Sequence, residues 1–281
     1  MTHYSGKERS EMLAVLESFF VTSIIEADEA SEYAFSVSDL LHEEKRDLIL
    51  SEQARQQGLE LGGAGSIAVG TLFAKRYSVW VMAVISACSL YDTLLNTGED
   101  VIRFELNGTG GMRYETRVER RLHPGLELKS GGDMGSSGHF LVQRSTEIRW
   151  IRDRLQQHLI RIFQSAAAAT GANIRVMNAL VAHNVQQLIL RMTGDQAIWK
   201  TDERLALIHH DAGVWLAPTK ENSFAARLQC FEHPEWQGPT FLIRPYCCLA
   251  YQVGKGDSAA HGYCSSCPKL DTAERLRMLL K

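Results

Sequence analysis

The sequence predicts an α+β fold, in which a mostly helical domain with antiparallel hairpins is followed by a small C-terminal module. Three observations predict this fold. Long stretches repeat apolar residues at helical spacing, and short strand-like segments flank glycine-rich turns. The strands do not alternate with helices as they would in βαβ units. The chain has 281 residues, enough for one large domain with an appendage. We expect the domain to span 1–238 and the module 239–281.

The first third of the chain is expected to be helical. Residues 8–26 place their apolar side chains on one helical stripe, and residues 38–56 follow Ser38 as a candidate N-cap. After a glycine-rich break, an apolar helix is expected over about 66–95. Its most apolar part, Tyr77 to Leu90, is shorter than the roughly 20 residues of a membrane-spanning helix. We therefore interpret this part as a buried core helix.

The remaining two thirds mix strands, a loop and helices. Strand-like segments on either side of NGTGG predict a hairpin, and two more on either side of HPEWQG predict another. A stretch rich in glycine and serine predicts a loop, and two amphipathic stretches and the C-terminus, capped by Asp271, predict helices. The hairpins are expected over 101–106 with 112–118 and over 225–231 with 240–247. The loop is expected over 123–138, and the helices over 145–170, 174–193 and Asp271 to Leu280. The structure of residues 203–217 is ambiguous from the sequence.

Composition and charge exclude some classes of function. The formal net charge is -3 and the pI about 6.4, without the basic excess of a nucleic-acid-binding protein, so no nucleic-acid partner is expected. The N-terminal segment is polar and lacks the pattern of a signal peptide, which predicts a cytoplasmic location. In that reducing compartment, a disulfide framework for the six cysteines is not expected.

Four cysteines lie close together near the C-terminus in the pattern CC-x15-CxxC: Cys247, Cys248, Cys264 and Cys267. Soft thiolates at such spacing favour zinc or an iron–sulfur cluster. Neighbouring side chains of an extended strand point to opposite faces, so the chain must bend at the adjacent pair if both thiolates are to reach one centre. A two-iron cluster offers separate attachment points, whereas structural zinc sites space their ligands two to four residues apart in each half. The pattern favours iron–sulfur and leaves zinc open.

The same segment resembles the C-terminal cluster module of FhuF-like ferric-siderophore reductases. That family combines an adjacent cysteine pair and a CxxC with an upstream Arg, a Leu and a Tyr after the pair, and a Pro after the last Cys. This chain shows Arg244, Leu249, Tyr251 and Pro268 in those places. Its gap between the two cysteine pairs is longer than the family's, with GKGDSAAHG carrying the excess.

Two upstream segments resemble the same family less specifically. SIAVGTLFAKRYSVWVMAVISACSL is similar to the family's N-terminal helical segment with its KRY-like element, and VMNALVAHNVQQL is similar to a segment that precedes the cluster region. The upstream domain is also similar to the C-terminal part of siderophore synthetases of the aerobactin type. This similarity implies a cleft of siderophore size.

The resemblance implies a ferric-siderophore reductase. A [2Fe–2S] cluster on the four cysteines would pass one electron to a bound Fe(III)-siderophore, of hydroxamate type, and release Fe(II) in the cytoplasm. No residue beyond the cluster is expected to act in catalysis, since no bond in the ligand is broken. With no nucleotide-binding motif in the chain, we expect an unidentified electron donor that is ferredoxin-, flavin reductase- or NAD(P)H-linked. Peripheral association with the inner membrane is compatible with this role. Two alternatives stay open: a siderophore-binding module with structural zinc, and an iron–sulfur electron carrier or sensor.

Several other residues are candidates for binding or are interpreted as structural. Arg244, Arg117, Arg113 and His183 are candidate substrate-binding residues, although a solvated strand face is an equally physical interpretation of the arginines on the first hairpin. His261 is a candidate replacement ligand, since it gives HxxCxxC with the last two cysteines. The remaining candidates are interpreted as packing or surface residues: Cys88, Cys230, His209, His210, Arg120 and Arg121.

Overall fold

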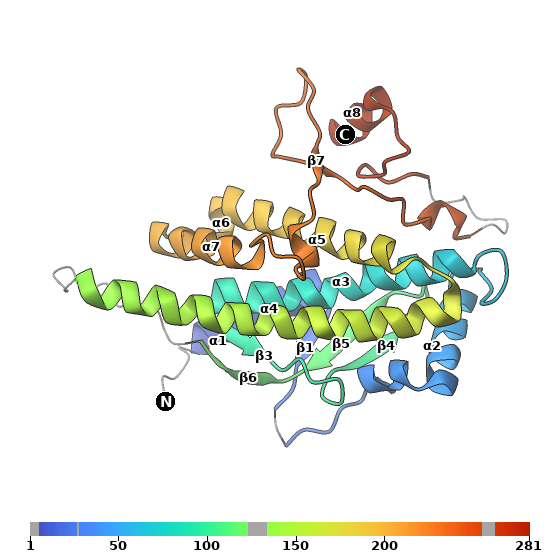
Figure 1. The fold of residues 1–281 in the computed structure, drawn as a ribbon, viewed down its shortest axis with the longest axis horizontal. Helices are drawn as coiled ribbons and strands as arrows, with labels where there is room; N and C mark the ends of the chain where they lie inside the picture. The colour runs from blue at the N-terminus through green and yellow to red at the C-terminus, as the bar shows by residue number, and fades with distance from the viewer. Residues whose placement is uncertain (1–5, 27, 123–133, 255–261) are drawn as a thin grey trace.

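The structure is a computed structural model that describes residues 6–26, 28–122, 134–254 and 262–281. Three helices, α3 (Ser66–Tyr91), α4 (Met134–Thr170) and α5 (Ile174–Gly194), pack side by side across the middle of the molecule. Two small sheets lie on one side of them, and the C-terminal residues rise on the other side (Figure 1). The mixture of helices with separate small sheets confirms the α+β class.

The first predicted helix is shorter than expected. Helix α1 (Gly6–Phe20) ends six residues before the predicted end at residue 26, and strand β1 (Thr22–Ile24) follows. The chain turns at Val21, whose φ of 44° lies in the left-handed region. The carbonyl of Val21 accepts a hydrogen bond from the N–H of Tyr114 at 2.8 Å. Sheet pairing therefore overrides the apolar periodicity that predicted a longer helix.

The second predicted helix is split in two. A 3₁₀ helix, η1 (Val37–Leu41), precedes α2 (Glu43–Gln56), and His42 between them is extended. The prediction that Ser38 caps the helix was wrong. Ser36 is the N-cap of η1, with Asp39 accepting from its N–H at 2.9 Å, and His42 is the N-cap of α2.

Helix α3 is the central core helix. It ends at Asp92, which takes a left-handed conformation with φ of 50°, and strand β3 (Thr93–Leu95) replaces the last residues of the predicted helix. Within the described residues, α3 is the one helix long and apolar enough to cross a membrane. Of the 18-residue stretch of α3 that is this apolar, 72% is buried inside the protein. This burial confirms the interpretation of Tyr77 to Leu90 as a core helix.

The helices after the first hairpin follow the predicted periodicity, with one extension. Helix α4 begins at Met134, so residues 134–138 of the predicted loop are helical, while residues 123–133 lie outside the described part of the chain. Helix α5 is capped by Asn173, whose side chain accepts from the N–H of Arg175. The ambiguous stretch is helix α7 (Asp202–Trp215), which follows the short α6 (Gln196–Trp199).

The larger sheet has the strand order β1-β5-β4-β2. The predicted first hairpin is confirmed: β4 (Arg103–Leu106) pairs antiparallel with β5 (Met112–Thr116). Strand β2 (Phe35–Ser36) adds antiparallel to β4, whereas β1 pairs parallel with β5. The expectation of antiparallel pairing alone was therefore wrong for β1. A second sheet joins β3 with β6 (Val118–Arg121).

The C-terminal lobe, defined as residues 229–254 and 262–281, is small. The predicted second hairpin is confirmed in a short form, with β7 (Gln229–Cys230) antiparallel to β8 (Leu242–Ile243). This pairing crosses the predicted domain boundary at residue 238, and the boundary stays a prediction. The 3₁₀ helix η2 (Ser223–Ala225) lies directly before the lobe. The lobe also contains the 3₁₀ helix η3 (Ala250–Gln252) and helix α8 (Thr272–Leu279), which is capped by Asp271 as expected.

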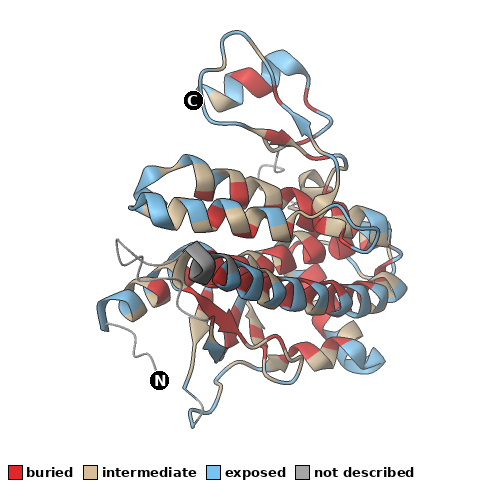
Figure 2. Ribbon diagram, turned by 60° about the vertical axis from the view of Figure 1, so that its left-hand side comes forward, coloured by how far each residue is buried: buried red, intermediate tan, exposed pale blue. Residues whose placement is uncertain are grey.

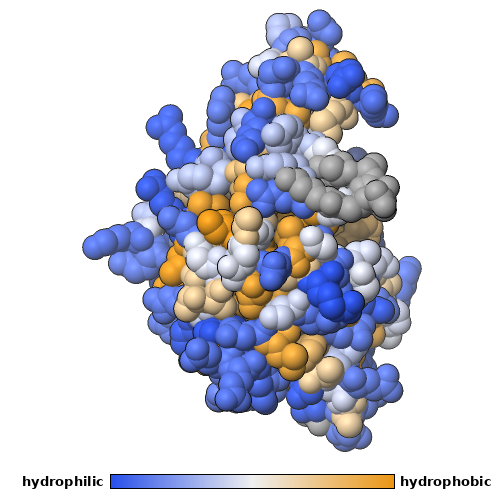
Figure 3. Space-filling model, turned by 90° about the vertical axis from the view of Figure 1, so that its right-hand side faces the viewer, coloured by the Kyte–Doolittle hydropathy of each residue, from blue (hydrophilic) through white to orange (hydrophobic). Residues whose placement is uncertain are grey.

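The body, defined as residues 6–26, 28–122 and 134–228, holds most of the buried side chains. Figure 2 shows buried residues concentrated in its central helices and strands and few in the lobe. Figure 3 shows a largely hydrophilic lobe above a body face on which apolar residues gather. The body has an apolar core of its own, and the lobe is attached to it beside α3 and α5.

Candidate functional site

The four cysteines of the C-terminal pattern converge where the lobe meets the body. Cys267 Sγ lies 3.6 Å from Cys247 Sγ. The thiol of Cys248 interacts with that of Cys264. Cys248 and Cys267 keep 1% of their surface exposed, whereas Cys247 and Cys264 are partly exposed. The thiols therefore form two pairs, and each pair has one buried and one more accessible member.

The expected bend between the adjacent cysteines is not what the structure shows, because the chain turns directly after the pair. Leu249 takes a left-handed conformation with φ of 61°, and its N–H donates to Cys247 Sγ at 3.4 Å. The carbonyl of Cys248 accepts from the hydroxyl of Thr71 on α3 at 2.9 Å. The side chain of Cys248 packs against Leu72 and Leu180, so α3 and α5 hold this thiol in place.

The CxxC segment forms a tight turn in which the N–H of Cys267 donates to the carbonyl of Cys264 at 2.8 Å. Two buried arginines hold this turn. Arg275 Nη2 donates to the carbonyl of Cys267 at 2.6 Å, and its Nε donates to that of Ser265 at 3.0 Å. Arg244 donates through its backbone N–H to the Ser266 carbonyl at 3.0 Å and through Nε to the Ser266 hydroxyl at 3.0 Å.

The guanidinium of Arg244 also faces the sulfurs. The residue is 2% exposed, and its Nη2 contacts Cys264 Sγ. Its Nη1 is buried without a hydrogen-bond partner, and no carboxylate of the described chain lies within ion-pair distance of it. Burial would lower the pKa of Arg244, but the thiols, Cys248 first, raise it above its ordinary value. This buried cation has sulfur as its only counter-charge among the described side chains.

One cation from the body, Lys75, and one from the lobe, Arg244, act on the same thiols. The contact with Cys264, followed by the charges of Lys75 and Arg244, lowers the pKa of Cys248 to about 4 against the opposing effect of burial. The pKa of Cys264 is raised, because the proton of this pair stays on its sulfur. Burial raises the pKa of Cys247. One pair therefore has strong thiolate character even before any metal binds.

The described side chains include no group of three or more His, Cys, Asp or Glu that could hold a single metal ion. Contacts join Cys247 with Cys267 and Cys248 with Cys264, and Cys247 also interacts electrostatically with Cys248. A structural zinc site needs four ligands around one ion, whereas a [2Fe–2S] cluster takes two ligands on each of two irons. The four-thiol donor set, with the unpartnered Arg244 Nη1 beside it, is chemically suited to either group.

His183 links the body to the lobe. It is 5% exposed, its Nε2 lies 2.9 Å from the carbonyl of Leu242 on β8, and its Nδ1 lies 3.1 Å from Asn184 Oδ1. Burial lowers the pKa of His183, so the ring stays neutral near pH 7. With one N–H, the neutral ring can donate to the Leu242 carbonyl through Nε2, and the residue thereby positions β8. Its role in binding substrate stays a prediction.

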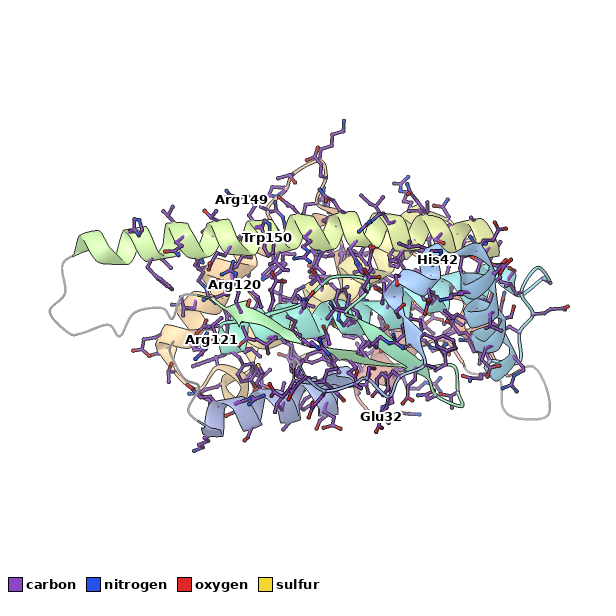
Figure 4. The ribbon with its side chains drawn as sticks, turned by 90° about the horizontal axis from the view of Figure 1, so that it is seen from below. Glu32, His42, Arg120, Arg121, Arg149 and Trp150 are labelled. Carbon is purple, nitrogen blue, oxygen red and sulfur yellow. The ribbon has the colours of Figure 1, made fainter. Side chains whose placement is uncertain are left out.

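The structure does not bring the hairpin arginines to the thiols. Arg113 lies 3.8 Å from the carboxylate of Glu105, and Arg117 donates to the carbonyl of Glu29 at 2.9 Å. Both belong to the sheet side, and α3 and α5 lie between that side and the lobe (Figure 1). Figure 4 shows Arg120 and Arg121 on the same side, beneath α4. A solvated strand face accounts for these contacts.

The other candidates divide into core and surface residues. Cys88 is fully buried in α3, which confirms it as a packing residue. Cys230 is exposed and lines a cavity of about 470 Å³ in the lobe, with Arg244 and Arg275 also in its wall. On α7, His209 is exposed and His210 lies 2.9 Å from the hydroxyl of Ser145, as expected of surface histidines. His261 lies outside the described residues.

Several residues that surround the thiols carry little signal in the sequence. Lys75 and Arg76 belong to the KRY-like element, and their position beside Cys248 depends on how α3 packs on the lobe. Tyr263 and Lys269 flank the CxxC and lie over the more exposed thiols. Their adjacency to the cysteines in sequence was the one available signal.

No family model and no curated protein matches this chain.

Proposed function

We propose that this chain is a ferric-siderophore reductase that carries a [2Fe–2S] cluster on Cys247, Cys248, Cys264 and Cys267. The observation that carries the proposal is the environment of these thiols. They lie in two pairs around the guanidinium of Arg244, which is buried and has no carboxylate partner among the described residues. A buried cation needs negative charge beside it. Thiolates are the groups next to Arg244 that can supply this charge, and four thiolates that bind iron would do so.

The pairing of the thiols favours iron–sulfur over the alternative of structural zinc. Each pair supplies two sulfurs to one place, as two separate irons require. Structural zinc sites space their ligands two to four residues apart in each half, whereas Cys247 and Cys248 are adjacent in the chain.

When bound, the cluster would supply a one-electron redox centre. The residues of this chain would hold and tune it: Arg244 donates to Cys264, and the Leu249 N–H donates to Cys247. The partly exposed sulfurs of Cys247 and Cys264 mark the edge at which electrons would enter and leave. The substrate, a ferric hydroxamate, binds Fe(III) tightly and Fe(II) weakly, so one electron releases iron without cleavage of the ligand. The reaction therefore needs no acid, base or nucleophile.

The partners follow from the same proposal. A ferredoxin-, flavin reductase- or NAD(P)H-linked protein would supply the electrons, since the cysteine site alone stores one electron at a time. We place the reaction in the cytoplasm, with loose association at the inner membrane as a variant of the proposal. The described part of helix α3 that could span a membrane is mostly buried, which is typical of a core helix.

The test is the anaerobic visible and EPR spectrum of the purified protein before and after dithionite, followed by titration with a ferric trihydroxamate and capture of Fe(II). We expect an absorbing oxidised form, one spin per chain on reduction, and Fe(II) release. Cys247→Ser is expected to abolish the colour and the activity together, whereas Cys88→Ser, in the core of the body, serves as the matched control and keeps both.

Two outcomes would replace the proposal. A colourless protein with one zinc per chain would establish the structural-zinc alternative. A reducible cluster that transfers no electron to any ferric chelate would establish an electron carrier or sensor.

A further inference from the structure

Two tyrosines and a lysine lie over the exposed edge of the thiol site. The rings of Tyr251 and Tyr263 pack edge to face, with centroids 5.3 Å apart. Lys269 Nζ lies 4.8 Å from the Tyr251 ring centre and 6.0 Å from that of Tyr263. It also donates to the Tyr251 hydroxyl at 3.3 Å. We call these three residues the tyrosine–lysine surface.

This surface adjoins the more accessible thiols. Tyr263 directly precedes Cys264 in the chain and is 39% exposed. Lys269 is close enough to Cys247 for the two to interact electrostatically. The buried thiols, Cys248 and Cys267, face the other way, toward the protein. A molecule that receives an electron at the exposed edge would therefore contact Tyr263 and Lys269.

The charge beside this edge is positive and uncompensated. Lys269 is exposed, and no carboxylate within the described ranges forms an ion pair with it. On the body side of the site, Lys75 is likewise near the thiols and without an ion pair to a described carboxylate. The chain as a whole has a net charge of -3, so the positive potential is local to this site.

We infer that the tyrosine–lysine surface selects ferric chelates of net negative charge, such as hydroxamates that bear a free carboxylate. The inference rests on the proposed function and adds a substrate class to it. Lys269 would pair with the chelate's carboxylate, and the ring faces of Tyr251 and Tyr263 would pack against its hydrocarbon linkers. The iron of the chelate is then held beside the edge formed by Cys247 and Cys264.

A small chelate fits this surface better than an acidic donor protein. Electron-transfer complexes between proteins bury up to about 1,200 Å² and use broad charged patches. Here the positive charge on the lobe side comes from one lysine between two aromatic rings, and Asp271 follows it two residues later. The rings offer apolar contact area that the carboxylates of an acidic protein would not use.

The experiment uses one ferric trihydroxamate in three forms. A linear chelate with a terminal amine is used free, acetylated and succinylated, which gives net charges of about +1, 0 and −1 with the same iron coordination. The dithionite-reduced protein is mixed with each form, and KM and kcat are measured by Fe(II) capture. For the unaltered protein we expect the KM to be lowest for the succinylated form, by about threefold relative to the acetylated form, as one exposed charge pair provides.

Variants assign the effect to the surface. Lys269→Gln is expected to remove the charge ranking and Lys269→Glu to invert it, both with an unchanged EPR spectrum. Tyr251→Phe removes only the hydroxyl that accepts from Lys269 and is expected to weaken the ranking. Lys220→Glu is the matched control, an exposed lysine in the body after α7, and should keep the ranking.

Three outcomes would overturn the inference. One is a ranking that Lys269→Glu leaves unchanged. Another is a KM that is equal for the three chelates in the unaltered protein. The third is an effect of Lys269→Glu confined to reduction of the cluster by an acidic donor protein, which would make this surface the donor's docking site. The proposed function fails differently, by an absent cluster signal or by no reduction of any of the three chelates.

Discussion

Arg144 in the body and Arg244 in the lobe are both buried, but different groups compensate their charges. In the body, the side chain of Arg144 is 1% exposed and lies between Asp92 and Asp211, with 2.7 Å from Nη1 to Asp92 Oδ1 and from Nη2 to Asp211 Oδ2. In the lobe, Arg244 is 2% exposed and has no described carboxylate beside it. Its polar neighbours are a serine hydroxyl and thiols.

The two regions also differ in how they bury apolar surface. The body has a continuous core of fully buried side chains such as Trp80, Phe163 and Trp215. The buried aliphatic and aromatic side chains of the lobe each keep 5% to 8% of their surface exposed: Phe231, Leu242, Leu270 and Leu276. The body therefore has a continuous apolar core and a buried ion-pair network around Arg144, whereas the lobe has only a few buried apolar side chains.

The largest effect is expected from removing the body's buried cation. Arg144→Met keeps most of the volume but leaves Asp211, which is fully buried, without its cation. Breaking a buried ion pair in this way costs about 3–5 kcal/mol. Urea denaturation followed by far-UV circular dichroism should show a loss of that size in the free energy of unfolding.

Arg149→Met is the control, because Arg149 is exposed on the same helix (Figure 4). It is expected to change the free energy of unfolding by less than about 0.5 kcal/mol. Equal effects for Arg144→Met and Arg149→Met would show that the carboxylates do not need Arg144. The contrast between body and lobe would then be wrong.

A second effect comes from a base that the body buries in its neutral form. His158 is 2% exposed, and its Nε2 lies 2.5 Å from the hydroxyl of Tyr77. Burial, followed by the charges of Arg161 and Arg154, lowers the pKa of His158 to about 3. In the unfolded chain its pKa is about 6.5, so on acidification the unfolded state binds a proton that the folded state does not.

The stability that neutral His158 contributes is thus fully present above pH 6.5 and is lost as the pH falls from 6.5 toward 3. Between pH 7 and pH 4.5 the loss amounts to about 2–3 kcal/mol. The measurement is the free energy of unfolding by urea at several pH values for the unaltered protein and His158→Gln. The variant should lack this part of the pH dependence, and parallel curves for both proteins would refute the assignment.

The sequence predicted the elements whose local signals agree with their surroundings. The amphipathic helices α4 and α5, the first hairpin and the cap at Asp271 follow from periodicity and turn chemistry. The failures lie where tertiary pairing overrides the local pattern. The chain leaves its helix at Val21 because the backbone there pairs with β5, and the residues after Asp92 form a strand because they pair with β6.

The cysteines of the candidate site were predictable from the sequence, whereas the residues around them were not. Cys247, Cys248, Cys264 and Cys267 are marked by spacing alone, and the structure brings them together in pairs. Lys75 is far away in sequence and reaches the thiols only because α3 packs beside the lobe. Such a contact depends on the fold as a whole, for which periodicity and motif spacing carry no signal.

The smallest expected effect tests the lobe's arginine directly. If the thiols hold a [2Fe–2S] cluster, the positive charge and hydrogen bonding of Arg244 favour the reduced, more negative state. Arg244→Gln should therefore lower the midpoint potential by on the order of 50 mV, since 59 mV corresponds to about 1.4 kcal/mol for one electron. An EPR-monitored potentiometric titration measures this shift.

Arg244→Lys keeps the charge and should shift the potential less, and the exposed Arg227→Gln should not shift the potential. A potential that Arg244→Gln leaves unchanged would mean that the guanidinium does not face the electron-carrying group. If Arg244→Gln lowered the free energy of unfolding as much as Arg144→Met does, groups of the chain itself would balance the charge of Arg244. Either result would remove the difference between the two buried arginines on which the proposed cluster rests.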